Sequence, residues 1–467
     1  MTPSSAPPDP AGRVETHGID VIPDDERRGR ARELFAVWAA PNVSYLSLVL
    51  GGALVLSGLT MWQAFAVIVV GNLLWALVGL VAVSGPAAGV PSEVITRAMF
   101  GVRGNRVAIA VNGWFASLCY LALNWAAASV AAVSLADRLG FPAGTGMTTV
   151  IIVTIAAITL AISVYGHATI VKLYLPFTLA LTAIFVALAA FVMGHTEWGY
   201  RPAHPLHGGA LWAALSGGIA LIASTPLSYS NSADFSRYLP RATSRGAVAM
   251  WTALGGFVPG VLFTALGVMA GTALDMSDPQ EALATIVPPW FQPTFLFAII
   301  LGAIANNAMT AYSSGLALQA AGVRIRRSLS IAVNGAIGVG LTLYALLVSN
   351  FLDTVSSILE LMAALMGPAI AVYAADILWR RNRYDGHLLT DESRGGLYWY
   401  TGGVNWAGVT ALLLGTIVAS QCLDTSMYTG PIAGAAGGLD LSLPAGITVS
   451  ATAYVVLMRA HRRRARA

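Results

Sequence analysis

Charged residues are what this sequence lacks most. Only 10% of its 467 residues are Asp, Glu, Lys or Arg, whereas 56% are hydrophobic. A typical soluble domain carries about 25% charged residues. A chain of this length could bury a large core, but here there are too few charges to cover the surface around it. The composition therefore excludes a soluble globular protein and indicates a polytopic membrane protein.

Cysteine and the common catalytic motifs are also scarce. Cys119 and Cys422 are too few for a disulfide framework. The sequence has no glycine-rich phosphate loop with a lysine, so it carries no internal ATP-driven motor. It also has no His-Glu-x-x-His zinc motif, no paired cysteines and no triad pattern. We therefore expect no enzyme activity, no catalytic residues, and no bound metal or cofactor.

Long apolar stretches fill most of the chain. Each approaches the roughly 20 residues that a helix needs to cross a bilayer. The sequence therefore predicts an all-α membrane protein with twelve transmembrane helices. The predicted spans are Leu34–Ser57, Trp62–Ser84, Val107–Leu135, Met147–Val164, Ile170–Gly194, Gly208–Ser230, Ala247–Leu274, Thr294–Ala321, Ile331–Ser349, Val355–Trp379, Val404–Gln421 and Leu441–Met458.

The basic residues give an orientation. If the N-terminus is cytoplasmic, all of the 26 lysines and arginines except Arg138 and Arg201 fall in inner segments. Cytoplasmic loops carry such an excess of basic residues. The pattern predicts a cell-membrane protein, plasma or inner, with both termini in the cytoplasm. The net charge of +4 then reflects membrane orientation and not nucleic-acid binding.

Two predicted spans are interrupted near their middles, one at Pro41 and one at Pro226. Proline removes a backbone donor and clashes with the preceding turn. Asn42 and Ser44 can satisfy freed backbone groups at the first break. The breaks lie five spans apart, so the two halves insert in opposite senses. Broken helices at matching places in inverted halves mark the midplane site of many secondary transporters.

The organisation that follows is an inverted five-plus-five repeat with broken helices 1 and 6. Residues 1–33 are expected to be a disordered cytoplasmic tail without the apolar core of a signal peptide. The first repeat is expected at 34–194 and the second at 208–379. A cytoplasmic loop at 380–403, two accessory helices at 404–458 and a basic tail at 459–467 follow.

Polar residues inside the spans indicate a cavity. Asn306 and Asn307 lie near the middle of the eighth span, with Thr310 one turn later. A buried amide is costly unless it is hydrogen-bonded, so such a stripe faces a cavity or another helix. In the third span, Tyr120 and Asn124 lie on one helical face and can contact a planar ligand.

Charged residues near the spans leave alternatives open. Glu360 in the tenth span either titrates with a proton or simply lies near the end of its span. Asp234 follows the sixth span, with Arg237 and Arg241 after it. A capping or gate ion pair is favoured there over a role in substrate chemistry.

The chain resembles the nucleobase–cation symporter family NCS1, especially its purine–cytosine permease branch. Five motifs in the right order on the right spans carry the resemblance. They are Gly18–Glu26, Gly85-Pro86 with Arg97–Gly104, Ala233–Tyr238, Ala305–Tyr312, and Ala375-Asp376 with Arg380–Tyr384. The resemblance implies the fold of the neurotransmitter–sodium symporters plus two helices, and import of a nucleobase with a cation.

The resemblance also implies site residues. In this family a planar base lies between aromatic side chains of spans three and six, and amides bind its polar edge. Tyr120 matches the span-three aromatic and Asn124 follows it. Thr225 replaces the usual span-six aromatic, which leaves Tyr45 or Tyr229 to supply the second ring.

For the cation, sodium-coupled members use backbone carbonyls of broken span one, here around Pro41–Ser44, and two hydroxyl side chains on span eight. These hydroxyl positions correspond to Ala305 and Asn306. Neither side chain carries a hydroxyl, which favours H⁺ over Na⁺ as the co-transported ion. Asn306 and Asn307 are then expected to read the base, because an amide can donate and accept hydrogen bonds at once.

The sequence thus predicts a transporter that imports cytosine, purines or both by cation symport through alternating access. Its partners are the nucleobase and the lipid bilayer, without nucleic acid; the oligomeric state stays open. Allantoin, a hydantoin or hydroxymethylpyrimidine remain alternative substrates. An amino-acid transporter of the same fold also remains open. A sensor or membrane enzyme would need a soluble domain or catalytic constellation that the sequence does not contain.

Overall fold

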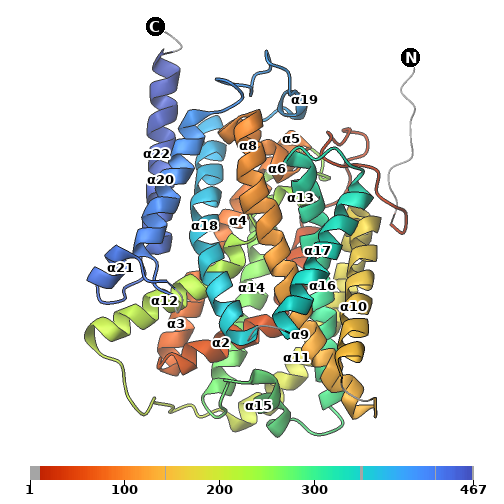
Figure 1. Cartoon of the computed structure of the whole chain (residues 1–467), viewed down its shortest axis with the longest axis vertical. Helices are drawn as coiled ribbons and strands as arrows, with labels where there is room; N and C mark the ends of the chain where they lie inside the picture. Colours follow the sequence, from red (N-terminus) through yellow and green to blue (C-terminus); the bar gives the residue numbers. More distant parts are fainter. Residues whose placement is uncertain (1–10, 142–143, 348–350, 426–427, 465–467) are drawn as a thin grey trace.

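The computed structural model is a bundle of long helices (Figure 1). It describes residues 11–141, 144–347, 351–425 and 428–464, except the side chains of 347, 351–360, 363 and 464. Within these ranges the only β pairings are two isolated bridges, Thr401 with Val404 and Asp424 with Thr429. The predicted all-α class is therefore confirmed.

The helices follow one another with short connections. In the first half they are α1 (Glu33–Asn42), α2 (Tyr45–Leu56), α3 (Met61–Asn72), α4 (Trp75–Ala82), α5 (Ser84–Ala88), α6 (Ser92–Ile95), α7 (Arg97–Phe100), α8 (Val102–Ile109), the π-helix η1 (Ala110–Phe115), α9 (Ala116–Arg138), α10 (Thr145–Tyr165) and α11 (His167–His195). In the second half they are α12 (Gly208–Leu227), α13 (Ala233–Ser236), α14 (Arg245–Gly271), α15 (Pro279–Ile286), α16 (Gln292–Ala320), α17 (Arg327–Leu347), α18 (Phe351–Arg380), α19 (Gly386–Thr390), α20 (Trp406–Cys422), α21 (Pro431–Ala435) and α22 (Ser442–Arg464).

Many of these helices can cross a membrane. Within the described residues, nine are long and apolar enough, and a tenth span results if α1 and α2 count as one bent helix. The 17-residue α20 is shorter. The twelve-span count stays a prediction.

The chain bends between α1 and α2. The two helices meet at 55° across Val43 and Ser44. The helix was expected to break at Pro41, but it continues through that residue, and the Val43 N–H still donates to the Ala39 carbonyl at 2.9 Å. Proline removes only its own donor, so the turn can close after it. Ser44 then caps α2, because its hydroxyl accepts from the Ser47 N–H.

A second irregular segment follows α12. This helix continues through Pro226 and ends at Leu227, and turn residues lead into the short α13. As at Pro41, the helix ends just after the proline and not at it. The segment 228–232 therefore has backbone groups that are not all committed to a helix.

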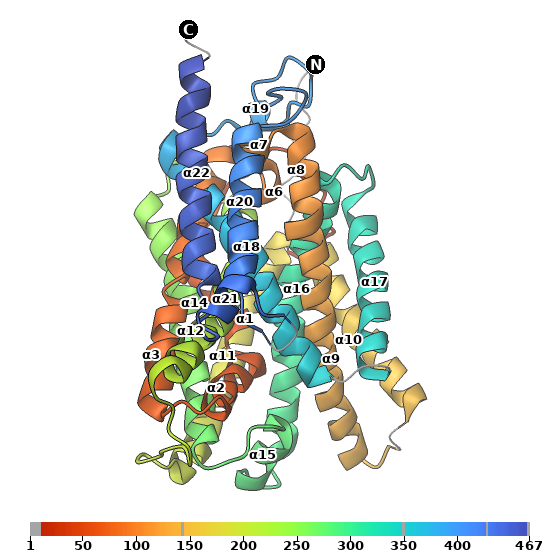
Figure 2. The same cartoon turned by 60° about the vertical axis from the view of Figure 1, so that its left-hand side comes forward.

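The long helices form two groups. α14 packs on α1, α2, α3 and α4, and α12 packs on α3; α9, α10, α16 and α17 pack on one another. Figure 2 shows α9, α10, α16 and α17 on the right and α2, α3, α12 and α14 on the left. Contact within the first group requires glycine at two positions. A Cβ on Gly51 would lie 2.0 Å from the Thr264 carbonyl oxygen, and one on Gly267 would lie 1.9 Å from that of Leu48.

The last helices dock on α18. α20 and α22 pack on each other and on α18. The buried Asp376 carboxylate of α18 holds α22, because it accepts from the Tyr454 hydroxyl at 2.5 Å. Within α18, Arg380 Nε also donates to this carboxylate at 2.8 Å. Figure 1 shows the C-terminal end of α22 at the same end of the molecule as α5, α6, α13 and α19.

Candidate functional site

A cavity of about 80 Å³ lies between the two helix groups. One water molecule needs roughly 10–15 Å³, so the space is larger than a single solvent site. Its lining comes from α2, α6, α7, α8, η1, α9, the end of α12 with the segment after it, α13, α16 and α18. The polar lining residues are Ser92, Glu93, Thr96, Asn112, Ser117, Tyr120, Asn124, Thr225, Ser228, Tyr229, Ser230, Asn231, Asn306, Thr310 and Tyr373.

Helix α9 supplies an aromatic ring and an amide to this cavity. Tyr120 and Asn124 both line it, as predicted from their shared face. The Tyr120 hydroxyl lies 3.5 Å from the Ser224 carbonyl of α12, so it reaches across to the other group of helices. The Asn124 amide donates to the Tyr120 carbonyl at 2.9 Å, which leaves its oxygen to face other partners.

Helix α16 supplies a second amide. Asn306 and Thr310 line the cavity one turn apart. The Thr310 hydroxyl donates to the Asn306 carbonyl at 3.1 Å. The Asn306 side chain lies within hydrogen-bonding reach of the Tyr229 hydroxyl. Thr225 of α12 also lines the cavity, on the side of the other group of helices.

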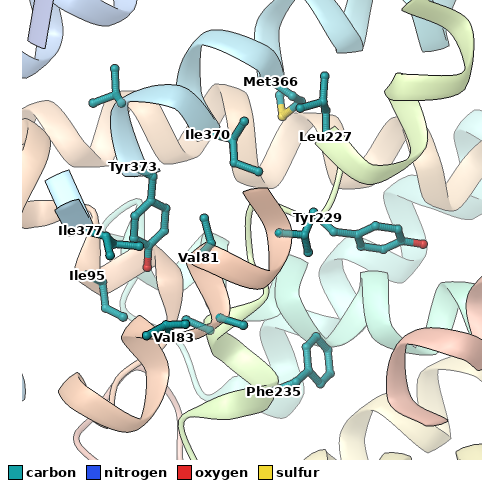
Figure 3. Close-up of a cluster of buried hydrophobic side chains, with 14 of the residues drawn as sticks. Val81, Val83, Ile95, Leu227, Tyr229, Phe235, Met366, Ile370, Tyr373 and Ile377 are labelled. Atoms are coloured by element: carbon teal, nitrogen blue, oxygen red, sulfur yellow. The ribbon is translucent and has the colours of Figure 1, made fainter. Parts of the chain in front are cut away.

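Tyr229 provides the second ring at the cavity. It stacks on Trp75 at a centroid distance of 5.4 Å and meets Trp38 edge-on at 5.1 Å. Figure 3 shows its ring extending away from the apolar cluster of Leu227 and Ile370, with the hydroxyl at the far end. Packing on two indoles fixes the ring and its hydroxyl in place.

Asn307 occupies a different position from the one expected of a base reader. It is fully buried, does not line the cavity, and donates to the Leu121 carbonyl of α9 at 2.9 Å. Neighbouring residues of an α-helix point about 100° apart. With Asn306 turned to the cavity, Asn307 therefore turns to α9. Of the two asparagines expected to read the base, Asn306 lines the cavity and Asn307 does not.

The residues expected near the first break also lie outside the cavity lining. Tyr45 packs edge-on against Phe295 at 6.1 Å. Asn42 donates to the Trp38 carbonyl at 2.7 Å, and Ser44 caps α2. Pro41 is buried within α1. These groups stabilise the bend itself.

The predicted gate pair has different partners in the structure. Asp234 and Arg237 form no ion pair with each other among the described residues. Asp234 accepts from the Ser92 N–H at 2.8 Å and from the Ser313 hydroxyl at 2.6 Å. Arg237 lies 3.5 Å from Glu15 instead. Asp234 lies on α13 and Arg237 directly follows that helix, and each reaches a different neighbouring segment.

Glu93 lines the cavity and was not singled out from the sequence. It is 3% exposed, and one of its carboxyl oxygens, Oε2, has no hydrogen-bond partner in the described part of the chain. The Asp234 carboxyl group lies within hydrogen-bonding reach of the Glu93 carboxyl group. Glu93 lies four residues before Arg97, a spacing that ordinarily indicates a surface ion pair on a helix. In the structure, Arg97 pairs with Glu392 at 2.7 Å. The spacing of Glu93 and Arg97 would therefore have predicted the wrong partner for Glu93.

Glu15 was also missed, because it falls in the tail expected to be disordered. Residues 11–32 instead pack on the bundle. The Glu15 carboxylate accepts from the His167 N–H at 2.7 Å and from the Tyr312 hydroxyl at 3.0 Å. Burial alone would raise the pKa of Glu15, but the guanidinium groups of Arg327 and Arg237 hold it below its ordinary value. A buried carboxylate between two arginines ties this segment to α11, α13, α16 and α17.

Two further expectations concern the role of Glu360 and the absence of a bound metal. The Glu360 side chain lies outside the described residues. In the part of the chain that the structure describes, no group of three or more His, Cys, Asp or Glu side chains could hold a metal ion.

The geometry can now be compared with known proteins. A family model described as "Permease for cytosine/purines, uracil, thiamine, allantoin" matches residues 21–446. The chain belongs to this family of permeases. It is the family that the sequence motifs indicated, so the predicted membership is confirmed.

Two relatives from Bacillus subtilis (strain 168) are similar over almost their whole length. A putative purine-cytosine permease, YxlA, is 26% identical over 464 residues, which covers 96% of each chain. An allantoin permease is 23% identical over 499 residues, which covers 97% of this chain and 94% of the relative. The family and these relatives make the protein a multi-pass membrane transporter and not an enzyme.

Solved structures show the fold. Mhp1, a nucleobase-cation-symport-1 family transporter in a closed conformation with bromovinylhydantoin bound, has a TM-score of 0.77 at 17% identity, over 96% of each chain. An inward-facing conformation of Mhp1 gives 0.70 over 96% of each chain. A sodium-coupled sialic acid symporter gives 0.59 at 12% identity, over 91% of each chain.

Proposed function

We propose that this permease imports a nucleobase, cytosine or a purine, by symport with a cation through alternating access. The observation that carries the proposal is the cavity between the two helix groups, where two tyrosine rings and two amides converge. Tyr120 and Tyr229 present aromatic surface, and Asn124 and Asn306 present groups that donate and accept hydrogen bonds. A flat heterocycle with an alternating polar edge matches this lining.

Alternating access is supported by where the cavity lies. α9 and α16 form one wall, and the segment after α12 forms another. These elements belong to the two different groups of packed helices, so rocking of one group against the other would expose the cavity to each side in turn. We interpret the bend at Val43–Ser44 and the irregular segment 228–232 as the broken helices of two inverted five-helix repeats, at 34–194 and 208–379. We propose twelve spans with cytoplasmic termini.

Proton coupling is favoured over sodium coupling. The two span-eight positions where sodium-coupled relatives carry hydroxyls are Ala305 and Asn306. The Asn306 side chain lies within hydrogen-bonding reach of the Tyr229 hydroxyl. The Ala305 carbonyl accepts a hydrogen bond from the Tyr174 hydroxyl. Sodium would find fewer oxygen ligands here than a hydroxyl pair would provide.

Another small heterocycle is the second candidate. The cavity has Thr225 where many relatives have an aromatic residue, and this smaller side chain leaves room beside Tyr229. Allantoin, a hydantoin or hydroxymethylpyrimidine would use the same amides. An amino-acid substrate is disfavoured, because no arginine or lysine lines the cavity among the described residues to pair with a carboxylate.

Uptake by proteoliposomes tests the proposal. The full chain is reconstituted and offered labelled cytosine, adenine, hypoxanthine, allantoin and leucine, with a pH gradient, a sodium gradient or neither. We expect cytosine or a purine to accumulate with the pH gradient and an uncoupler to abolish accumulation. Uptake of leucine alone would overturn the assignment. Uptake of allantoin without the bases would select the second candidate.

A further inference from the structure

Two acidic residues meet at one end of the cavity, and the mechanism above uses neither of them. Glu93 lies on α6 and Asp234 on α13, 141 positions apart in the chain. Glu93 is 3% exposed and Asp234 is fully buried. Their carboxyl groups lie within hydrogen-bonding reach of each other. Two carboxyl oxygens can bond to each other only when a proton lies between them.

The partners of the pair show which group carries that proton. Asp234 accepts from the Ser92 N–H at 2.8 Å and from the Ser313 hydroxyl at 2.6 Å, so both of its oxygens have donors. These bonds stabilise an ionised Asp234. The Glu93 carboxyl has a backbone hydrogen bond within its own residue, but its Oε2 is buried without a partner in the described chain, and the residue faces the cavity.

The surrounding charges favour the same assignment. Burial raises the pKa of Glu93 well above its ordinary value, and the Asp234 carboxyl raises it further. Arg237, which directly follows α13, acts in the opposite direction, and Tyr373 on α18 also faces the pair. Two adjacent carboxyl groups titrate as one unit, with one proton held to a higher pH than either would hold it alone.

We infer that Glu93 and Asp234 form the proton-binding site of this transporter, in which Glu93 takes up a proton from the cavity and Asp234 stabilises it. This inference rests on the proposed proton symport. Protonation forms an O–H bond on the Glu93 carboxyl, and release returns the proton to water on the other side of the membrane. No other covalent change is involved.

The position of the pair explains how a proton could affect the cavity. Asp234 is bonded to Ser313 of α16, so the pair joins α13 to the other group of helices. With one proton the two carboxyl groups attract each other, and without it they are two repelling anions in a dry site. The state in which they lie together is therefore favoured by protonation, and coupling is this difference in affinity between states.

Proteoliposomes with the full chain test the site. With labelled cytosine and an imposed pH gradient, we expect the wild-type protein to accumulate the base. Glu93→Gln should only equalise the inside and outside concentrations, because glutamine cannot release a proton. Glu281→Gln changes an exposed carboxyl on α15 and serves as the matched control that still accumulates. Accumulation by Glu93→Gln at the wild-type level would overturn the inference.

Infrared difference spectroscopy across a pH titration gives a readout that needs no substrate. We expect a protonated carboxyl band in the wild-type protein that disappears on raising the pH and is missing in Glu93→Gln. In Asp234→Asn the band should titrate at lower pH, since a neighbouring negative charge is removed. An unchanged band in Glu93→Gln would overturn the site even if that variant cannot transport. If Glu93→Gln does not fold, the titration of the band in Asp234→Asn tests the site. A band that titrates at the wild-type pH in that variant would overturn the inference.

The outcomes separate this inference from the proposed function. Failure of the wild-type protein to exchange any base of the panel would refute nucleobase transport, while the infrared band would still test the pair. Accumulation driven by sodium without a pH gradient would keep the transporter and overturn the proton site.

Discussion

At the residue scale, the two adjacent asparagines of α16 have separate tasks. Asn306 faces the cavity and the Tyr229 hydroxyl, whereas Asn307 bonds α16 to the Leu121 carbonyl of α9. One step along the helix turns a side chain by about 100°. The same residue type therefore lines the cavity at one position and links two helices at the next.

Substitution of each asparagine should separate these roles. We expect Asn306→Ala to lower base uptake about tenfold, since the loss of roughly 1.4 kcal/mol of hydrogen bonding changes an equilibrium by that factor. We expect Asn307→Ala to lower stability by about 0.5–2 kcal/mol, the range for hydrogen bonds between membrane helices, and to transport normally per folded molecule. Uptake assays and thermal unfolding in detergent measure the two effects. The reverse pattern would return the reader to Asn307.

At the element scale, the segment before α1 is a structural part of the bundle. Ile22 is fully buried, and Arg27 donates to the Pro86 carbonyl at 3.1 Å. His17 bridges Asp20 at 2.7 Å and Glu26 at 2.9 Å, which closes the segment on itself. A polar, proline-rich stretch is predicted to be disordered when its partners are distant in the chain, as Pro86 is from Arg27 and Tyr312 is from Glu15, because no local pattern records such contacts.

The closure by His17 should depend on pH. Its hydrogen bond to Asp20 raises the pKa of His17 to about 9, against burial, which lowers it. A raised pKa means that the bridge contributes fully below the ordinary value near 6.5 and is lost as the pH rises through about 9. A spin label at Arg13→Cys, with Cys119 and Cys422 replaced, should therefore gain mobility between those values. His17→Gln is the control, with mobility that does not change over this range; a flat wild-type profile would contradict the prediction.

At the scale of the whole molecule, the cavity lies where two groups of helices meet. α14 packs on α1, α2, α3 and α4, and α16 packs on α9, α10 and α17. Small residues allow both kinds of contact, within one group and between the two. A Cβ on Gly271 of α14 would lie 3.1 Å from that of Val55 of α2 in the same group, and one on Gly302 of α16 would lie 3.9 Å from the Ser44 Cα beside the bend.

Cross-links across these two contacts should differ in effect. Disulfides need Cβ atoms roughly 3.5–4.5 Å apart, so both pairs can be tested with small adjustments. In a background without Cys119 and Cys422, oxidation of Gly302→Cys with Ser44→Cys should block uptake, and reduction should restore it. The matched pair Gly271→Cys with Val55→Cys should leave uptake unaffected, since α14 and α2 move together. Equal loss of uptake in both would contradict rocking of one group against the other.

The sequence by itself determined the class of molecule. The shortage of charge, the long apolar stretches and five ordered motifs led to a membrane permease of this family, because hydrophobic length and local motifs are properties of neighbouring residues. It also predicted a polar cavity face from Tyr120 and Asn124 and from Asn306 and Thr310, because residues about one helical turn apart share a face. These four residues line the cavity.

Only the tertiary structure decided how those helices turn toward one another. It turned Asn306 to the cavity and Asn307 to α9, paired Arg237 with Glu15, and brought Glu93 beside Asp234. The rotation of a helix about its axis depends on packing against helices that are distant in the sequence. Hydrogen bonds that span 142 residues, such as that of Ser92 to Asp234, leave no local pattern from which to infer them.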